Sequence, residues 1–460
     1  MFSEAAAPVD ASLAASIARR KEWRKSYLGP VRQIVEAGAR SGKDALRIAG
    51  EGLAAVHHNI VFRRGDEDVS LHDALESPAN RAPFETGTIT GRGARLKEIV
   101  VPYRGETLRG DGLARQLDRW CAAGVVEPSC VGAVTAVMEN PDWLDLSGMT
   151  FVLLGAAAEM GPFESLCRWG ADVVAVDLDR PTVWDRIVNV ANEGSGRVRF
   201  PQRDGGRGAD LLADTPELAA WLRSLEGPLV VGSYAYADGS SFLKLAAALD
   251  ALTVSLQRDR SSVTIAYLAT PTDVFAVPVE VVDKSRGRRL SPPSRLARAV
   301  TRGGAFAPNY PELVDGENGR QWGIADSLIP QQGPNYALAK MLQRWRALVA
   351  REEGTLTSAN VAPATRTRSV VKNKILAAAY RGASAFGIEI FEPETSRALM
   401  AAMLVHDLRN PGAAARPDTP LDHPFDLFAD GAAHGGLWSV PYAPRTVLPL
   451  AVAIGAVKRR

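Results

Sequence analysis

The stretch MTFVLLGAAAEMGPFESLCRWGADVVAVDLD, residues 149–179, decides the fold. Its first seven residues, MTFVLLG, form a nearly continuous apolar run of the kind found in strands that are buried on both faces. PFESLCRWG (162–170) follows as a short helix, and ADVVAVDLD (171–179) follows as a second strand. A strand, a helix and a strand in succession predict two parallel strands joined by a crossover helix.

The same alternation continues as far as Asp273. A third strand fits before Asp210, a helix with Thr215 as its N-cap fits in 215–227, and a fourth strand fits in 228–239. A further helix and a strand that ends near Asp273 complete the series. Strands that alternate with helices predict an α/β fold, in which a doubly wound parallel sheet carries helices on both faces.

Composition places the chain among ordinary globular proteins. It has 460 residues, of which 46% are hydrophobic and 23% charged, and its formal net charge is +2. This charge balance gives no reason to expect a nucleic-acid partner. Three cysteines, Cys121, Cys130 and Cys167, are too few and too scattered for a disulfide framework or a zinc site, and the six histidines form no HExxH motif. We therefore expect a cytoplasmic protein without a bound metal.

The two ends of the chain bear on membrane contact. The first 30 residues lack the order of charged, apolar and small residues that a secretory signal has. No segment holds 18 uncharged apolar residues, so we expect no membrane-spanning helix. The end of the chain, VLPLAVAIGAVKRR (447–460), is apolar and then basic, which predicts either a segment packed on the core or a segment in contact with a membrane surface.

The turn GAAAEMG after the first strand has features of a phosphate-binding turn. Gly155 can form the tight turn, and Gly161 allows close approach where the helix begins, so that free N–H groups at the helix N-terminus could bind a diphosphate. Asp177 follows Gly155 by 22 residues, at the end of the second strand, where a carboxylate can accept hydrogen bonds from the ribose hydroxyls of an adenosine. This spacing favours NAD over NADP, although Arg180 could accommodate a 2′-phosphate.

GPNYALAK, residues 333–340, contains a tyrosine and a lysine one helical turn apart, Tyr336 and Lys340. An ammonium group at that spacing can lower the pKa of the phenol and so prepare it to exchange a proton with a carbonyl oxygen. Because a Tyr-x-x-x-Lys pair is common by chance, its meaning depends on the glycine turn and the acidic residue upstream.

Together, the glycine turn, the acid after the second strand and the late Tyr-x-x-x-Lys motif resemble the short-chain dehydrogenase/reductase family. The four defined positions of that family's Thr-Gly-x-x-x-Gly-x-Gly turn are here Leu154, Gly155, Glu159 and Gly161, so its first and last glycines match. Asp210 matches the acid that contacts adenine in the family, whereas GSYA (232–235) replaces Asn-Asn-Ala-Gly. After the tyrosine helix, TLTSANVAPATRT supplies Asn360, Pro363 and Thr367, with Ala364 in place of a glycine. The resemblance covers about 149–390.

This resemblance implies an NAD(P)-dependent oxidoreductase that interconverts an alcohol and a ketone or aldehyde by hydride transfer. Tyr336 would be the general acid or base, Lys340 would lower its pKa, and Thr270 would replace the family's serine in holding the substrate oxygen. Thr272 and Ser327 are the other hydroxyls close enough in sequence for that role. The cofactor contacts implied are Gly155, Glu159, Met160, Gly161, Asp177, Asp210, Leu211, Gly232, Ser233, Pro363 and Thr367.

The resemblance also divides the chain. Residues 1–147 are predicted to be a mostly helical N-terminal extension of unknown function. Residues 148–395 would form a Rossmann-type dinucleotide-binding and catalytic domain, with an insertion at about 274–330 because Tyr336 stands later than is usual in the family. Residues 396–460 would be a substrate lid or a packing segment, in which Trp438 and Tyr442 could line a pocket for a small, lipophilic substrate.

Three alternatives remain open at the level of sequence. Glu159 places a negative charge inside the turn that would face phosphates, so the turn could bind nothing. A catalytically degenerate, nucleotide-binding member of the same fold would explain the lost middle glycine and the lost Asn-Asn-Ala-Gly. An S-adenosylmethionine-dependent methyltransferase would also have a glycine turn and an acid after the second strand.

Overall fold

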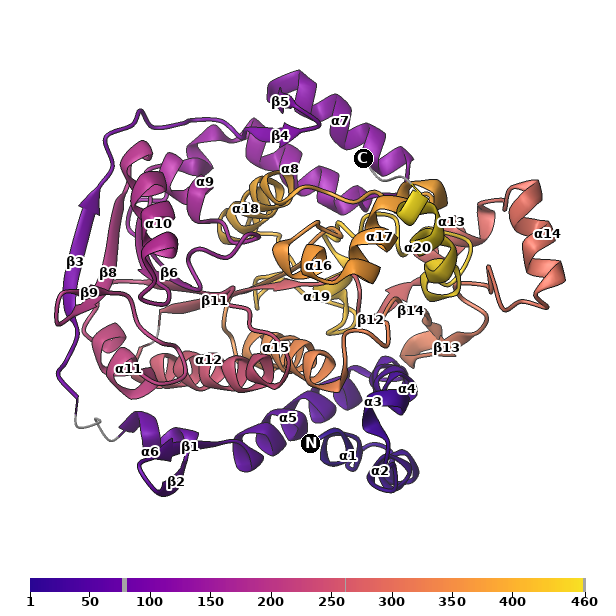
Figure 1. Cartoon of the computed structure of the whole chain (residues 1–460), viewed down its shortest axis with the longest axis horizontal. Helices are drawn as coiled ribbons and strands as arrows, with labels where there is room; N and C mark the ends of the chain where they lie inside the picture. Colours follow the sequence, from indigo (N-terminus) through magenta and orange to yellow (C-terminus); the bar gives the residue numbers. More distant parts are fainter. Residues whose placement is uncertain (77–80, 261, 458–460) are drawn as a thin grey trace.

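The structure of the chain is a computed structural model that describes residues 1–76, 81–260 and 262–457 (Figure 1). Its centre is a sheet with the strand order β3-β8-β7-β6-β10-β11-β15, to which β9 adds beside β8. The bounds of these strands are β3 (Glu85–Thr90), β6 (Thr150–Leu154), β7 (Asp172–Val176), β8 (Arg197–Arg203), β9 (Gly206–Arg207), β10 (Leu229–Ser233), β11 (Val263–Ala269) and β15 (Thr357–Val361). The six strands from β8 to β15 are parallel, whereas β3 and β9 run antiparallel to β8. The prediction of an α/β fold is confirmed, and the central sheet is mostly parallel.

The order of the parallel strands reverses in the middle of the sheet. Counted along the chain, they stand in the order 3-2-1-4-5-6, so the chain winds in one direction from β6 to β8 and in the other from β10 to β15. Leu154 at the end of β6 pairs with Ser233 at the end of β10 across the point of reversal. In open α/β sheets ligands bind outside the carboxyl ends of the strands at such a point. This edge is therefore the first place to look for a site.

Helices cover both faces of the sheet (Figure 1). Val152 and Leu154 of β6 belong to one apolar core, which includes residues of three helices on that face, α11 (Thr215–Arg223), α12 (Ser240–Asp259) and α15 (Pro334–Glu352). Phe151 and Leu153 point into the second core, beneath α9 (Phe163–Arg168), α10 (Pro181–Glu193) and α18 (Pro393–Arg409). Burial on both faces explains why the strand reads as a continuous apolar run.

The N-terminal extension is not separate from the sheet. Its first helices pack against the outer side of α12 and α15, and β3 forms the edge of the central sheet (Figure 1). Of the later helices of the extension, α8 packs against α18, and α7 packs against α8. The elements of the extension are α1 (Phe2–Ala6), α2 (Ala11–Ala18), α3 (Trp23–Ser26), α4 (Leu28–Ala39), α5 (Gly42–Asn59), β1 (Val61–Arg64), β2 (Glu67–Ser70), α6 (Leu71–Glu76), β4 (Val101–Tyr103), β5 (Glu106–Leu108), α7 (Gly110–Ala122) and α8 (Pro128–Glu139).

Residues 274–330, where an insertion is expected, form a second and smaller sheet. It is antiparallel, with the order β12-β14-β13, and α14 projects from it (Figure 1). The bounds are β12 (Val274–Pro278), α13 (Val279–Gly287), α14 (Pro292–Val300), β13 (Leu313–Asp315) and β14 (Gln321–Asp326).

The last part of the chain is helical. Its helices besides α18 are α16 (Arg368–Lys372), α17 (Lys374–Ala383), α19 (Asp426–Ala429) and α20 (Leu448–Val457), of which α17 and α20 pack closely together. Within the described ranges, no helix has both the length and the apolar character that crossing a bilayer demands.

One sequence-based capping assignment is wrong. Thr215 is the first residue of α11, and Asp214 occupies the N-cap position. The Thr215 hydroxyl instead donates a hydrogen bond to the carbonyl oxygen of Leu211, at 2.8 Å.

Candidate functional site

The predicted site residues gather at the carboxyl edge of the central sheet. Each follows or ends a different parallel strand: Gly155 after β6, Asp177 after β7, Asp210 after β8, Gly232 and Ser233 at the end of β10, Thr270 after β11, and Pro363 after β15. Because the six strands run in the same direction, all of these positions lie along one edge. The topology thus brings together residues that are up to about 200 positions apart in the chain.

Gly155 is required where it stands. Its φ of +90° lies in the region that favours glycine, and a Cβ built on it would lie 2.5 Å from the backbone of Ala235. The N–H groups of Tyr234 and Ala235 donate to the carbonyl oxygen of Leu154, at 2.9 and 2.8 Å. The loop after β10 is therefore held directly against the turn.

The turn has less need of a glycine at position 161. Its φ is not positive, and a Cβ there would meet no atom closer than 3.5 Å. The helix that follows, α9, has only six residues. The second glycine of the motif is therefore not needed by the geometry of this turn.

The carboxylate of Asp177 is engaged by the turn itself. One of its oxygens accepts from the N–H of Ala157 and the other from the N–H of Leu178, both at 2.9 Å. Burial raises the pKa of Asp177, and the two hydrogen bonds oppose that rise. The sequence predicts that this carboxylate faces a ribose, and the structure instead shows it joining the end of β7 to the glycine turn.

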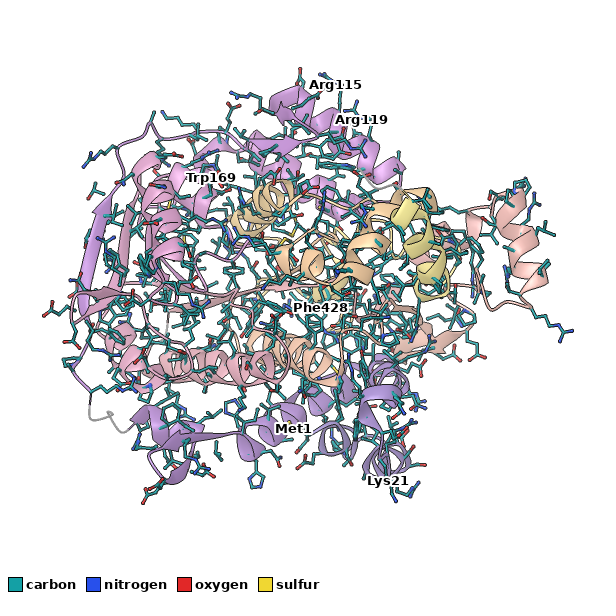
Figure 2. All side chains as sticks on the ribbon, in the orientation of Figure 1. Met1, Lys21, Arg115, Arg119, Trp169 and Phe428 are labelled. Carbon is teal, nitrogen blue, oxygen red and sulfur yellow. The ribbon has the colours of Figure 1, made fainter. Side chains whose placement is uncertain are left out.

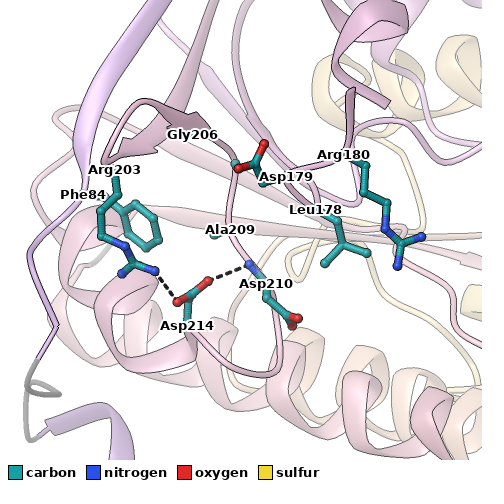
Figure 3. A pocket seen from close by; sticks show the side chains of 10 residues that line it. Phe84, Leu178, Asp179, Arg180, Arg203, Gly206, Ala209, Asp210 and Asp214 are labelled. Carbon is teal, nitrogen blue, oxygen red and sulfur yellow. Dashed lines mark hydrogen bonds and ion pairs between the residues drawn. The ribbon is translucent and has the colours of Figure 1, made fainter. Parts of the chain in front are cut away.

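A cavity of about 330 Å³ lies beside the ends of β7 and β8 (Figure 3). The charged residues that line it include Asp179 and Arg180, which directly follow the end of β7, whereas Asp177 does not line it. Its volume is at the lower end of the range found for small-molecule sites. The full lining is Phe84, Leu178, Asp179, Arg180, Arg203, Gly206, Gly208, Ala209, Asp210 and Asp214.

Asp210 lines the same cavity and also shapes its wall. Its carboxylate accepts from the N–H groups of Leu212 and Ala213, at 2.8 and 3.2 Å. Its own N–H donates to Asp214, at 2.9 Å, and Asp214 is held by Arg203 at 2.5 Å (Figure 3). Leu211 is buried in the core and does not line the cavity.

Glu159 joins the glycine turn to the loop after β15. Its carboxylate accepts from the N–H of Arg368 at 2.7 Å and lies 3.4 Å from the guanidinium of the same residue. Thr367, the residue before, occupies the N-cap position of α16, and its hydroxyl lies 2.9 Å from that of Ser369. Met160 packs against the core below α9. The negative charge of Glu159, which is expected from the sequence to face phosphates, is therefore paired with Arg368.

Three arginines surround this turn. Arg186 of α10 donates to the carbonyl oxygen of Ala157 at 3.1 Å, and Arg397 of α18 pairs with Glu164 at 2.6 Å. Burial, and then the nearby charges of Arg397 and Arg368, lower the pKa of Arg186. No sequence pattern indicates this cluster, because its members come from three elements that meet only in the fold.

Tyr336 stands in the first turn of α15, half-buried among aromatic rings. Its ring centroid lies 5.5 Å from that of Phe242 and 6.5 Å from that of Tyr236. Burial raises the pKa of Tyr336 well above its ordinary value, and a hydrogen bond with the side chain of Thr270 opposes this. Among the candidate hydroxyls it is therefore Thr270 that meets the phenol; the buried hydroxyl of Ser327 has no partner in the described part of the chain.

Lys340 lies one turn further along α15. Its ammonium donates to the carbonyl oxygen of Leu268 at 3.3 Å and to the side chain of Gln343 at 3.1 Å. Burial lowers its pKa to about 8. Its ammonium lies 5.5 Å from the centroid of the Phe242 ring. Lys340 also lines a small cavity together with the buried Phe428, which lies in the middle of the molecule (Figure 2).

The loop that leads into α15 is held by two residues that the sequence did not single out. Gln332 donates to the carbonyl oxygen of Thr272 at 2.8 Å, and Thr272 contacts Thr270, hydroxyl to hydroxyl, at 2.9 Å. Tyr27, which precedes α4, donates its hydroxyl proton to the carbonyl oxygen of Ile329 at 2.7 Å and accepts from the N–H of Gly333 at 2.9 Å. No pattern in the sequence could reveal a contact between residues some 300 positions apart.

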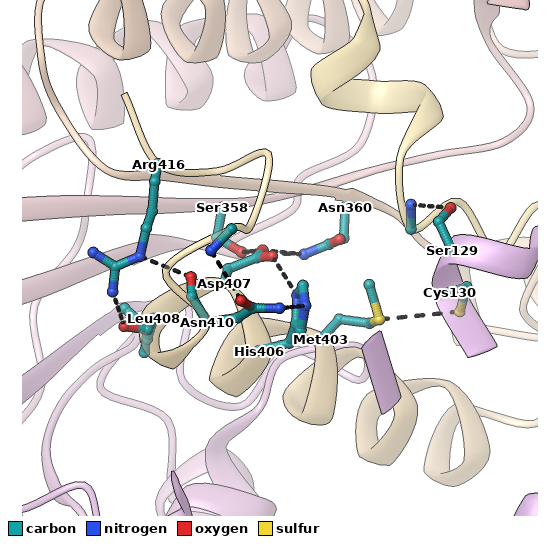
Figure 4. Close-up of polar contacts among 12 residues, drawn as sticks. Ser129, Cys130, Ser358, Asn360, Met403, His406, Asp407, Leu408, Asn410 and Arg416 are labelled. Carbon is teal, nitrogen blue, oxygen red and sulfur yellow. Dashed lines mark hydrogen bonds and ion pairs between the residues drawn. The ribbon is translucent and has the colours of Figure 1, made fainter. Parts of the chain in front are cut away.

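Asn360 belongs to a buried polar cluster behind β15 (Figure 4). Its amide and the hydroxyl of Ser358 both donate to the carboxylate of Asp407 in α18, at 2.7 and 2.6 Å. The amide of Asn410 reaches the neighbouring His406 at 2.7 Å. Asn360 therefore joins β15 to α18. Pro363, beyond the strand, is buried and accepts from the Thr365 hydroxyl at 2.7 Å.

Comparison with known proteins adds no relative: no protein-family model matches this sequence, and no curated protein is significantly similar to it.

Proposed function

We propose that this protein is an NAD(P)-dependent oxidoreductase of the short-chain dehydrogenase/reductase type, built on a Rossmann-type sheet. The observation that carries the proposal is the placement of Thr270, just after β11, near Tyr336 in the first turn of α15, with Lys340 one helical turn away. Two hydroxyl groups and an ammonium group of low pKa, next to the reversal point of a parallel sheet, suit proton exchange with a carbonyl substrate.

The residues around the turn fit a dinucleotide. Gly155 lets the loop after β10 lie directly against the turn, and Arg186 supplies positive charge beside it, while Arg368 and Arg397 pair with Glu159 and Glu164. The cavity beside Asp210 would take an adenosine. When bound, a nicotinamide cofactor would supply or accept the hydride. Arg180 at this cavity leaves room for a 2′-phosphate, so both NAD and NADP are candidates.

The chain's own residues would handle the proton. Because burial raises its pKa, the Tyr336 phenol is protonated at neutral pH and can donate to a substrate oxygen. Thr270 would hold that oxygen with its hydroxyl. Lys340, with a pKa of about 8, is mostly charged at neutral pH and would favour the tyrosinate that remains. Phe242 and Tyr236 make the surroundings of the phenol aromatic, which suits a lipophilic alcohol or ketone.

A second candidate is a nucleotide-binding protein of the same fold that has lost catalysis. The observation that favours it is the pairing of Glu159 with Arg368, because this carboxylate bridges the two loops between which a diphosphate would lie. Asp177, which is expected in the cofactor site, is likewise engaged in contacts within the protein.

The test is turnover. The full-length protein is mixed with NADH or NADPH and a panel of lipophilic ketones and aldehydes, and oxidation of the cofactor is followed by its absorbance. We expect turnover that falls at least about 100-fold in Tyr336→Phe and is unchanged in Tyr103→Phe, whose hydroxyl bonds Glu389 on another part of the molecule. Cofactor binding without turnover of any substrate would favour the second candidate. Equal activity of the two variants would refute the assigned role of Tyr336.

A further inference from the structure

Exposed apolar side chains gather on four helices of this protein. In residues 1–76, 81–260 and 262–457, eight large hydrophobic side chains are exposed, and six of them belong to α14, α16, α17 and α20. They are Leu296 (66% exposed), Val300 (74%), Val371 (47%), Ile375 (50%), Leu450 (38%) and Val457 (86%). Single exposed apolar residues are normal on a protein surface, but such a concentration marks an interaction site.

Contacts between their flanking loops join α14, α17 and α20, and α16 packs on α17. Phe306, in the loop after α14, packs its ring on Phe386 after α17 and on Tyr442 before α20, with centroids 6.1 and 5.1 Å apart. The N–H of Ala443 donates to the carbonyl oxygen of Ala307 at 2.7 Å. Figure 1 shows α13, α14, α17 and α20 at the same end of the molecule.

Two of these helices form a tight pair. At Gly382 of α17 and Gly455 of α20 no side chain would fit, because the carbonyl oxygen of the facing helix occupies its place. Leu450, Ala453 and Val457 lie along one exposed stripe of α20, which contains no charged residue. Packing on α17 therefore covers only one side of this apolar helix.

The same region is strongly basic, although the whole chain carries a formal net charge of only +2. Residues 284–311 contain seven basic residues and no acidic one, and residues 365–388 contain five basic residues and no acidic one. Six exposed or half-exposed cations in these segments pair with no carboxylate of the described residues: Arg289, Arg295, Arg298, Arg302, Lys372 and Lys374.

Helix α14 shows how charge and apolar surface are combined. Leu296 and Val300 lie one turn apart on one face, and Arg295 and Arg298 lie on the other. No residue of α14 is buried; Ala297 packs partly against the core, whereas Leu296 and Val300 remain exposed. A short helix with an apolar face and a basic face is typical of a segment that lies in a membrane interface.

We propose that α14, α16, α17 and α20 form a surface that binds anionic phospholipid membranes. The apolar side chains would enter the interface, and the unpaired cations would meet the lipid phosphates. This charge complementarity favours a lipid surface over a protein partner, since the apolar residues stand on separate projecting helices with basic residues around them. The proposal stands whether or not Tyr336 is catalytic.

Flotation of the full-length protein with lipid vesicles tests the proposal. We expect it to float with vesicles of equal parts phosphatidylcholine and phosphatidylglycerol, less so as salt is added, and not with phosphatidylcholine alone. The double variant Leu296→Glu and Val300→Glu should lower partitioning at least about tenfold. Val61→Glu is the matched control, because Val61 is also exposed (47%) but lies on β1 in the N-terminal extension. Far-ultraviolet circular dichroism confirms folding of each variant.

A second set of variants separates charge from apolar contact. Arg295→Gln, Arg298→Gln and Arg302→Gln should each reduce partitioning by up to about fivefold at low salt. Absence of binding to anionic vesicles, or an equal loss in Val61→Glu, would overturn the proposal. So would self-association in sedimentation experiments that the Leu296 and Val300 changes abolish without any effect on vesicle binding, because the apolar face would then belong to a second copy of this chain.

Discussion

Burial acts in opposite directions on two residues of α15. It raises the pKa of the Tyr336 phenol, and it lowers that of the Lys340 ammonium to about 8. In both cases the low-dielectric surroundings disfavour the charged form. The sequence-based hypothesis gave Lys340 the role of lowering the tyrosine pKa; in the described structure the ammonium bonds Leu268 and Gln343, and the phenol meets Thr270. The phenol of Tyr336 is therefore protonated at neutral pH.

The lowered pKa of Lys340 predicts a particular dependence of stability on pH. Its folded-state pKa of about 8 lies below the ordinary value, so between about pH 8 and 10 the unfolded chain binds more protons and the free energy of unfolding rises with pH, by at most about 1.4 kcal/mol per pH unit. Urea denaturation of Lys340→Met should lack this rise. Lys244→Met, at an exposed position of α12, should retain it. A rise that survives in Lys340→Met would contradict the burial argument.

A substitution at Glu159 tests the proposed phosphate site. Glu159→Gln removes a negative charge from the turn while an amide oxygen can still accept from the N–H of Arg368. We expect the affinity for NADH or NADPH to increase by about five- to tenfold in a fluorescence titration, because repulsion of the diphosphate is removed. Glu139→Gln, an exposed change on α8, should have no effect. Weaker binding by Glu159→Gln would mean that the carboxylate does not face the diphosphate.

The loop before α15 shows how one element depends on another. Tyr27 is completely buried, and its hydroxyl holds both Ile329 and Gly333 at the start of the helix that carries Tyr336. Gln332, between them, reaches Thr272 and so the hydroxyl pair that includes Thr270. The N-terminal extension, whose function the sequence left open, thus positions the loop next to the candidate site.

Removal of the Tyr27 hydroxyl should therefore destabilise the protein. Tyr27→Phe leaves a buried N–H and a partly buried carbonyl without their partner, at a cost of about 1–3 kcal/mol. Urea denaturation measures this loss. Tyr236→Phe, at a position that is 49% exposed, should change the free energy of unfolding by less than about 0.5 kcal/mol. A similarly small change in Tyr27→Phe would show that the loop is held by other contacts.

The sequence predicts elements of this fold better than contacts between them. The apolar runs that form β6, β7, β10 and β11 can be recognised in the sequence because these strands are buried on both faces. The carboxyl-edge residues follow from strand ends, so their common location could be expected. The Arg186 cluster, the role of Tyr27 and the pairing of Glu159 with Arg368 could not, because each joins segments that only the tertiary fold brings together.

On the scale of the whole molecule, a buried ion pair joins the N-terminal helix α5 to α12 and α15, two helices that cover the sheet. Arg346 of α15 donates to both carboxylate oxygens of Asp250 in α12, at 2.7 and 2.9 Å, and His57 of α5 reaches the same carboxylate at 2.7 Å. Burial alone would raise the pKa of Asp250, but Arg346 and His57 hold it at about 2. Three elements from distant parts of the chain therefore share one charge cluster.

Loss of this charge cluster should lower the free energy of unfolding. Asp250→Asn leaves Arg346 buried without its carboxylate and should cost about 3–5 kcal/mol. In the wild type this contribution is present above about pH 4 and is lost as the pH falls towards 2, since the folded-state pKa is the lower one. Thermal unfolding of Asp259→Asn, whose pair with Arg223 is half-exposed, provides the control and should change by less than about 1 kcal/mol. Equal effects of the two changes would show that burial gives the Asp250 pair no special importance.

The central claim is that the carboxyl edge of the sheet holds a nicotinamide dinucleotide, and calorimetric titration with NADH, NADPH and S-adenosylmethionine tests it most directly. We predict binding of at least one nicotinamide cofactor with a dissociation constant of about micromolar order and no binding of S-adenosylmethionine. Arg180→Ala should weaken the binding of NADPH more than that of NADH. Arg115→Ala, on the far surface of α7 (Figure 2), should weaken the binding of neither cofactor. No heat with either nicotinamide, or heat with S-adenosylmethionine alone, would contradict the account.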